Sequence, residues 1–157
     1  MEITLRRATM DDYHGMCILL DETDAFHARA LPHIFRHVKK ARSREFVESV
    51  LIDEDAIVVV AELEGQLIGL VHAAIRGTPD IPAIIPRRYA HVGDVIVTEK
   101  SRHSSVGRLL VREVEAWARR KGLISVELNV CDFNKDALAF YEELGYHAAS
   151  HNMSKEL

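Results

Sequence analysis

The stretch VTEKSRHSSVGRLLVREVEAWARRKG, residues 97–122, decides the fold because it joins the end of a strand to a helix through a short polar loop. Val97 closes an apolar, β-branched run of the kind that forms strands. Further on, apolar side chains recur at the spacing of one face of an amphipathic helix, at Val106, Leu110, Val114 and Trp117. The chemistry of the loop between these two elements is the first question that the sequence raises.

The loop at residues 102–107 is suited to hold a phosphate group. The first turn of a helix presents N–H groups without helical partners and the positive end of the helix dipole, and small residues let an anion come close to them. Arg102 and Arg108 add two cations that can form charge-assisted hydrogen bonds. On local chemistry alone, the same residues also fit an ordinary turn with a helix cap, so both interpretations stay open at this point.

The rest of the chain predicts strands and helices in a mixed order. Acidic residues after Thr9 predict a helix that runs to about residue 26, and helical spacing predicts another over 44–52. A last helix is expected over 134–144. The expected strands lie within 2–9, 56–76 (two strands that turn at Gly65), 89–99, 125–132 and 146–153, and a proline-rich loop covers 77–88. This order predicts an α/β (α+β) fold with a mostly antiparallel sheet, because the hairpin excludes a simple doubly wound parallel sheet.

Composition narrows the class of protein. With 157 residues, of which 48% are hydrophobic, the chain suits one domain over residues 1–157. A net charge of -4 argues against nucleic acid as a partner. Cys17 and Cys131 stand far apart without CxxC spacing, and the nine histidines show no metal-ligand spacing, so we expect no disulfide framework and no metal. Without a signal peptide or an apolar run long enough for a membrane span, we expect a cytoplasmic protein with no membrane contact.

A second motif, NKDALAFYEELGY at residues 134–146, adds to the loop. Asn134 stands at a helix start and Gly145 where a helix would end in a left-handed residue. Together, the two segments resemble the GCN5-related N-acetyltransferase (GNAT) superfamily. Arg102 and Gly107 match the first and last positions of its pyrophosphate-binding signature, while Ser105 stands where the first glycine is expected. The second segment matches at Asn134, Ala137, Phe140 with Tyr141, and Gly145 with Tyr146.

The resemblance covers nearly the whole chain and implies a fold, a cofactor and a reaction. The fold is a sheet of about six or seven strands flanked by about four helices. The reaction is transfer of an acetyl group from acetyl-CoA to an amine by direct attack in a ternary complex. In this family the strand before the loop splays from its neighbour and pairs with the pantetheine arm of the cofactor. The implied cofactor-binding residues are Val95, Val97, Arg102, His103, Ser104, Ser105, Val106, Gly107, Arg108, Asn134, Ala137 and Phe140, with the amide of Val95 near the acetyl carbonyl.

Two residues are expected to carry the chemistry. Tyr141 matches the family's proton donor to the departing thiolate, a task that suits a phenol because it is protonated at neutral pH. His91 falls where histone-modifying members carry a glutamate base, and an imidazole titrates near neutrality. Asp94 is the rival base, and strand alternation predicts that it faces the side opposite His91.

Ser105 departs from the family's pattern. A Cβ would be costly there if the position needed a positive φ, whereas a right-handed helical conformation tolerates serine without strain. We expect cofactor binding to survive.

The acceptor is an amine of a small molecule or of a protein or peptide, and the sequence does not choose between them. The resemblance implies that the acceptor pocket is built from the family's variable parts, here the segment after the first helix and the proline-rich loop. The stretch 21–37 offers the candidate residues Asp21, Glu22, Asp24, His27, Pro32 and Phe35. Carboxylates there would suit an ammonium group, although exposed acids are more often simply solvated. A homodimer is consistent with the resemblance. The alternative function is a module that binds acyl-CoA without transferring the acyl group; a nucleotide-binding enzyme is disfavoured because the loop has neither a Walker lysine nor GxGxxG.

Overall fold

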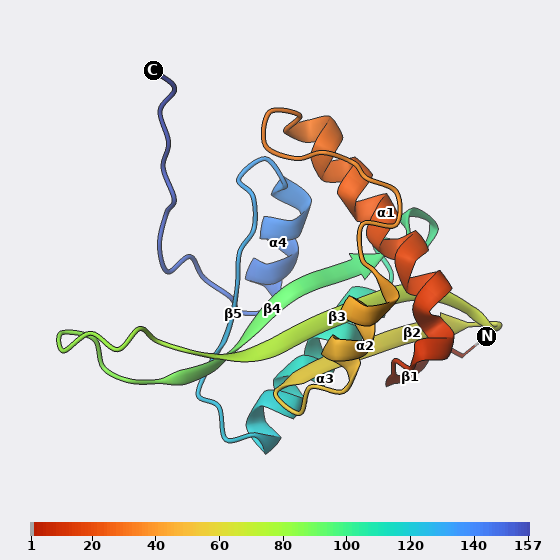
Figure 1. The fold of residues 1–157 in the computed structure, drawn as a ribbon, viewed down its shortest axis with the longest axis horizontal. Helices are drawn as coiled ribbons and strands as arrows, with labels where there is room; N and C mark the ends of the chain where they lie inside the picture. The colour runs from red at the N-terminus through yellow and green to blue at the C-terminus, as the bar shows by residue number, and fades with distance from the viewer. Residues whose placement is uncertain (1) are drawn as a thin grey trace.

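The sheet in the computed structural model, which describes residues 2–157, has the strand order β1-β2-β3-β4-β5 (Figure 1). The strands are β1 (Thr4–Arg7), β2 (Ala56–Leu63), β3 (Gln66–Gly77), β4 (Arg88–Val97) and β5 (Val126–Leu128). The first four pair antiparallel and β5 runs parallel to β4. The predicted mixed, mostly antiparallel α/β fold is therefore confirmed, with five strands in the described part of the chain instead of six or seven.

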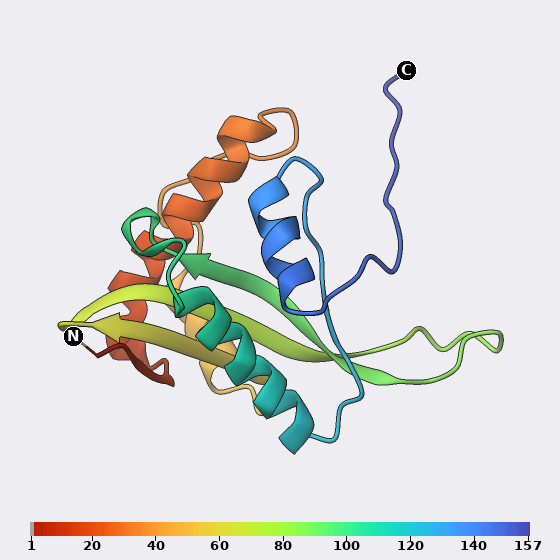
Figure 2. The same cartoon turned by 180° about the vertical axis from the view of Figure 1, so that it is seen from behind.

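The helices lie on both faces of this sheet. After the 3-10 turn η1 (Met10–Asp12), α1 (Tyr13–Ala30) and α2 (Arg44–Leu51) cover one face. The turn η2 (Glu99–Ser101) leads into α3 (Val106–Arg120) on the opposite face, and α4 (Lys135–Glu143) lies beside β4 and the chain after β5 (Figure 2). The four expected helices are thus confirmed.

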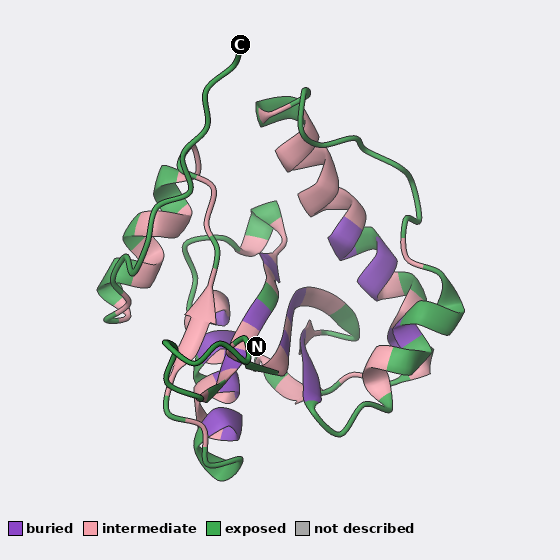
Figure 3. Ribbon diagram, turned by 60° about the vertical axis from the view of Figure 1, so that its left-hand side comes forward, coloured by how far each residue is buried: buried purple, intermediate pink, exposed green. Residues whose placement is uncertain are grey.

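The alternation of β2 and β3 divides the core into two layers (Figure 3). Val59 and Val71 point to the α3 side, where they are buried with Leu110. Val58 and Leu70 point to the α1 and α2 side. Because side chains alternate along a strand, neighbouring β-branched residues of one strand serve both layers, which explains the continuous apolar run of β2.

The β2–β3 hairpin turns at Glu64 and Gly65, as predicted. Both residues have positive φ, 52° and 77°, which is the conformation of a two-residue turn that matches strand twist. The predicted loop over 77–88 is confirmed as well: it projects from the body between β3 and β4, and it is closed at its base by the Thr78 N–H, which donates to Arg87 O at 3.1 Å.

The predicted strand over 146–153 was wrong. From Tyr146 onward the described chain forms no strand, and residues 147–157 are all exposed and extend away from the sheet. Residues 147–157 contain no β-branched side chain and almost no apolar alternation, so a strand there would bury little. Tyr146 itself is anchored differently, since its hydroxyl donates to Glu115 at 3.1 Å. The strand predicted over 125–132 is also shorter, ending at Leu128.

An ion pair fixes the start of α1. The guanidinium of Arg6 donates to both carboxylate oxygens of Asp12, at 2.8 and 2.9 Å, and also contacts Glu62 on β2. The same Asp12 carboxylate accepts from the Thr9 N–H at 2.8 Å. The side chain of Asp12 is buried, and the hydrogen bond from Arg6 lowers the pKa of this carboxyl. Asp12 therefore links β1 to the start of the helix. This role is additional to the favourable interaction with the helix dipole that the sequence predicts.

We expect Leu110→Ala to lower the free energy of unfolding by about 2–5 kcal/mol, because it leaves a cavity between α3 and the sheet. The side chain of Leu110 is 0% exposed. Ile18→Ala is the control, since Ile18 is 56% exposed and its truncation should cost about 0.5 kcal/mol or less. Urea denaturation measures both variants. Equal losses in the two would contradict the assignment of the core.

We expect Asp12→Asn to destabilise the protein by about 1–3 kcal/mol near neutral pH, because the charged hydrogen bonds to Arg6 and Thr9 are lost. Because the folded state holds the pKa of Asp12 below its usual value, this contribution is complete above an ordinary aspartate pKa of about 4 and is lost as the pH falls through the lower, folded value. Unfolding measured in urea across this pH range should show the two proteins converging in acid. A difference that stays constant with pH would contradict the role of the carboxylate charge.

Candidate functional site

The strand β4 diverges from β5 after three paired residues. The pairs are Ala90 with Val126, His91 with Glu127 and Val92 with Leu128, after which β4 continues to Val97 without β5 (Figure 2). On its other side β4 stays paired with β3 as far as Val97. An extended chain that ends its pairing in this way presents a free edge over residues 93–97, which another extended molecule can follow. The predicted residues Val95 and Val97 both lie in this segment.

The polar loop between η2 and α3 presents free main-chain donors. Ser105 has φ -72° and ψ -9°, a right-handed helical conformation, so its Cβ causes no strain, as the sequence analysis anticipated. The positive φ of the loop falls on His103, at 59°. Residues 102–105 are exposed. Within residues 2–157 no acceptor satisfies the main-chain N–H groups of His103, Ser104, Ser105, Gly107 and Arg108.

The two cations of the loop are held by acids of neighbouring helices. The Arg102 guanidinium lies 3.3 Å from a carboxylate oxygen of Glu22 on α1 and also donates to Val97 O at 3.3 Å. Arg108 lies 3.7 Å from Glu143 on α4. Val106 is buried beneath the loop, where it anchors the first turn of α3 in the core.

The second motif builds α4 and fixes it to that turn. Asn134 caps the helix: its side-chain oxygen accepts from the Ala137 N–H at 3.2 Å. Gly145 ends it with φ 92°, as predicted. A Cβ placed on Gly107 would lie 3.2 Å from the ring of Phe140, so the absence of a side chain at Gly107 lets α4 approach the loop closely.

Tyr141 stands in a half-buried aromatic setting on α4. Its ring centroid is 5.1 Å from that of Phe140 and 5.5 Å from that of Tyr146. Burial raises the pKa of Tyr141 to about 12, and the nearby charge of Asp94 adds to this rise. The phenol is therefore fully protonated at neutral pH and able to donate a proton.

A β-bulge overturns the predicted separation of His91 and Asp94. Asp94 pairs with His72 and Val92 pairs with Ala73, so Gly93 is an extra residue on β4 without a partner on β3. The extra residue shifts the alternation by one position, and His91 and Asp94 therefore lie on the same face of the sheet. Sequence alternation could not show this because it assumes a regular strand, although a glycine within a strand pattern is a signal for a bulge.

The same bulge adds His72, which the sequence analysis missed. Nδ1 of His72 lies 4.0 Å from a carboxylate oxygen of Asp94, and both side chains are about three-tenths exposed. Burial lowers the pKa of His72 more than the charge of Asp94 raises it. Burial likewise lowers the pKa of His91, helped by the positive charge of Arg76. Both imidazoles are therefore neutral at pH 7.

His91 has a different neighbour from His72. Its Nε2 lies 3.4 Å from the side-chain nitrogen of Asn129, which follows β5. The sequence brings the two histidines together only through sheet register, so neither spacing nor motif could have paired them.

The acids predicted to attract an ammonium group are engaged within the chain. Asp21 accepts from the Lys40 N–H at 3.0 Å, Glu22 is paired with Arg102, and Asp24 forms an ion pair with Arg42. The other predicted pocket residues divide: Pro32 is exposed, whereas His27 and Phe35 join an aromatic cluster with Phe26 and Phe133, with centroids 5.3 to 5.9 Å apart. Around the end of α1 the structure therefore offers aromatic rings more than free carboxylates.

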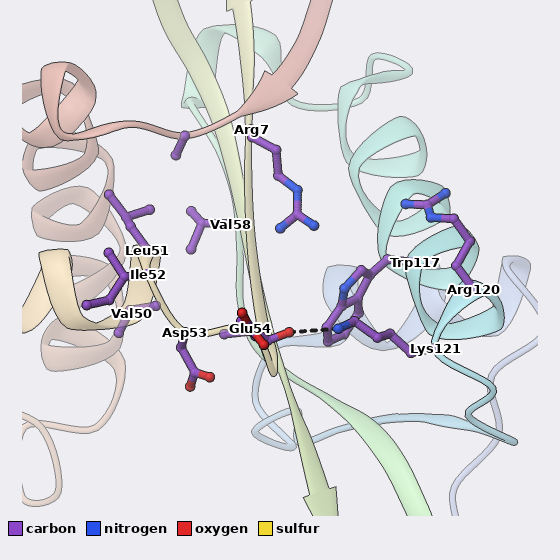
Figure 4. Close-up of a pocket in the computed structure, with 12 residues that line it drawn as sticks. Arg7, Val50, Leu51, Ile52, Asp53, Glu54, Val58, Trp117, Arg120 and Lys121 are labelled. Carbon is purple, nitrogen blue, oxygen red and sulfur yellow. Dashed lines mark hydrogen bonds between the residues drawn. The ribbon is translucent and has the colours of Figure 1, made fainter.

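A cavity of about 500 Å³ lies elsewhere, between the end of β1, the loop after α2 and the last turn of α3 (Figure 4). Arg7, Glu54, Trp117 and Lys121 are among its lining residues, and the Lys121 ammonium donates to Glu54 O at 2.9 Å. None of the predicted site residues lines it. The polar loop and the cavity stand at opposite ends of α3, so they are separate features.

Two further observations concern residues 2–157 as a whole. No group of three or more histidine, cysteine or acidic side chains in this range is arranged to bind a metal ion. No helix in the same range has the length and apolar character needed to cross a membrane.

Comparison with known proteins agrees with this geometry. Residues 20–146 match the family model described as "Acetyltransferase (GNAT) family". A thialysine N-epsilon-acetyltransferase of Caenorhabditis elegans is 32% identical over 59 residues, 38% of this chain and 37% of that protein. An uncharacterized N-acetyltransferase of Methanocaldococcus jannaschii is 25% identical over 91% of this chain and 60% of its own length. The chain thus spans less than two thirds of these curated relatives.

The fold has a close counterpart among solved structures. A mutant of the BH1408 protein from Bacillus halodurans superposes with a TM-score of 0.93 at 25% identity, over 98% of this chain and 99% of that one.

Proposed function

The chain belongs to the GNAT acetyltransferase family, and from that premise we propose that it acts as a single domain that moves the acetyl group of acetyl-CoA to an amine. The observation that carries the proposal is the free edge of β4, which is followed by a loop with five main-chain N–H groups that find no acceptor within residues 2–157. The extended pantetheine arm of the cofactor can pair with the strand edge, and its diphosphate can accept hydrogen bonds from the loop N–H groups.

The residues proposed to bind acetyl-CoA follow from this division. Val95 and Val97 would pair with the pantetheine arm through the main chain. The loop N–H groups would donate to the diphosphate, and the exposed hydroxyl of Ser105 could donate as well, whereas the Ser104 hydroxyl already donates to Ser101 O. Phe140 closes the far side of the loop against Gly107. The complete proposed set is Val95, Val97, Arg102, His103, Ser104, Ser105, Val106, Gly107, Arg108, Asn134, Ala137 and Phe140.

Asn134 supports this set indirectly. Its side-chain oxygen is used by the helix cap, which leaves its amide NH₂ to contact the cofactor. Ala137 stands on the first turn of the same helix, where a small side chain keeps the approach open.

The proposed chemistry divides between the strand and α4. The Val95 N–H would donate to the acetyl carbonyl oxygen as negative charge develops there. Tyr141 would give its phenolic proton to the departing thiolate, which its raised pKa of about 12 permits because the phenol is protonated beforehand. His91 would take a proton from the acceptor's ammonium group through water, since burial keeps its imidazole neutral.

The acceptor belongs to the amines, and the site favours one that carries an apolar body. The acids of α1 are already paired, whereas the cluster of Phe26, His27, Phe35 and Phe133 offers aromatic surface. A cation can also lie against such rings. A small-molecule amine or the amino group of a peptide would both fit this description.

We expect thiol release from acetyl-CoA on addition of at least one primary amine, in a panel that includes thialysine, L-ornithine, spermidine and peptides with free amino groups. Gly107→Glu should abolish acetyl-CoA binding in calorimetry, because it places a carboxylate against the phosphates and pushes on Phe140. Gly77→Glu is the matched control, since Gly77 is exposed at the far end of β3 and its variant should bind normally. Cofactor binding without thiol release across the panel would instead identify an acyl-CoA-binding module.

We expect Tyr141→Phe to lower kcat by about 10²-fold or more while changing the Kd of acetyl-CoA by about 3-fold or less, because only the proton to the thiolate is lost. The ring and its contacts with Phe140 and Tyr146 are kept. Steady-state thiol release and calorimetry measure the two quantities. Unchanged turnover, with chemistry shown to be rate-limiting in single-turnover experiments, would contradict the proposed role.

A further inference from the structure

The bulge at Gly93 places one histidine of β3 beside the position proposed for the acetyl carbonyl. His72 pairs directly with Asp94, the residue that precedes Val95. We propose that His72, oriented by Asp94, is the base that takes the proton from the attacking amine as the C–N bond forms. This assignment rests on the proposed acetyl transfer.

Sheet register favours His72 over His91 for this step. His91 pairs with Ala74, two residues farther along β3 from His72, which displaces it by about 7 Å along the strand direction. A base must reach the reacting nitrogen directly or through one water. His72 lies one register position along the sheet from Val95 and one strand across, about 3.4 Å and about 4.8 Å, whereas His91 lies three register positions, about 10 Å, along β4. His72 is therefore the nearer imidazole on this face.

The acceptor nitrogen loses two protons during the reaction, and each of the two histidines can accept one of them. An ammonium acceptor must lose one proton to become a nucleophile, and His91 can receive it through water. When the amine attacks, the C–N bond forms, the carbonyl π pair moves to oxygen, and the nitrogen carries a positive charge. His72 takes the second proton from that nitrogen. The C–S bond then breaks with its electron pair on sulfur, which is protonated by Tyr141, and the proton held on His72 returns through solvent to the tyrosinate.

The surroundings of His72 keep it a neutral base. Asp94 on β4 raises its pKa, as does Asp53 in the loop after α2, while burial and Arg76 on β3 lower it, with burial the largest influence. His91 lies on the same face of β4 and interacts with His72 electrostatically. The sum is a pKa below the usual histidine value, so the ring is ready to accept a proton at neutral pH.

Gly93 is required by this arrangement. A Cβ on Gly93 would lie 3.1 Å from Nδ1 of His72, tighter than ordinary van der Waals contact. The glycine thus leaves room for the imidazole to stand against Asp94. Nδ1 is 4.0 Å from the Asp94 carboxylate in the unliganded chain, a distance that catalytic hydrogen bonds commonly close when substrate binds.

The test compares three glutamine variants with the best amine from the thiol-release panel. His72→Gln should lower kcat by about 10²-fold or more, leave the Kd of acetyl-CoA within about 3-fold, and remove the acidic limb of the kcat profile. His91→Gln should lower turnover less and keep that limb. His14→Gln is the matched control, because the His14 side chain is exposed at the start of α1, and it should behave as the wild type.

Asp94→Asn tests the positioning role separately. Because the charge of Asp94 raises the pKa of His72, its removal should move the acidic limb to lower pH, and NMR titration of the His72 ring should show the same displacement. Gly93→Ala should lower kcat with little effect on cofactor affinity.

The outcomes separate the two proposals. If the wild type transfers acetyl groups but His72→Gln keeps its turnover, or keeps an acidic limb that His91→Gln removes, His72 is not the base and the proposed function stands. If the wild type releases no thiol with any amine, the proposed function fails and the assignment of His72 fails with it.

Discussion

The one-sided pairing of β4 is the constraint on which the site depends. β3 holds the whole length of β4, whereas β5 leaves it after Val92. A strand fixed along one edge stays extended and rigid while its other edge keeps free main-chain groups. The divergence also opens the space in which α4 approaches the first turn of α3, where Phe140 meets Gly107. The free edge of β4 and the approach of α4 to the polar loop therefore both depend on a single break in the sheet.

The bulge on β4 determines which side chains face the α1 side of the sheet. One unpaired residue, Gly93, reverses the alternation between Val92 and Asp94. Val92 and Val95 thus both serve the core layer under α3, while His91 and Asp94 both turn to the α1 side. Without the bulge, a strand that placed His91 on the α1 side would send the Asp94 side chain into the apolar layer under α3, where an unpaired charge is costly. Register, more than composition, assembles the polar cluster.

Features that depend on neighbouring residues could be predicted from the sequence, and features that depend on distant partners could not. The start of α4 at Asn134, the Gly65 turn, the conformation tolerated by Ser105 and the joint before α3 depend on a few neighbouring residues, and the structure confirms them. The bulge, the short β5 and the missing last strand depend on partners far along the chain. The same holds for His72, whose value arises only from its pairing with Asp94, and for Glu22, which meets Arg102 across 80 residues.

The ion pairs of the polar loop are weak enough to be exchanged for an anionic ligand at a small cost in free energy. Arg102 and Arg108 are exposed, and their partners Glu22 and Glu143 lie on separate helices. Exposed pairs of this kind contribute about 0–1 kcal/mol each, so exchanging a carboxylate for a phosphate costs little and gains a more highly charged partner. Glu22 also accepts the Glu99 N–H at 3.0 Å, so it keeps a role in holding η2 after Arg102 leaves. The main-chain donors stay in place throughout, because Val106 and Leu110 anchor the first turns of α3 in the core.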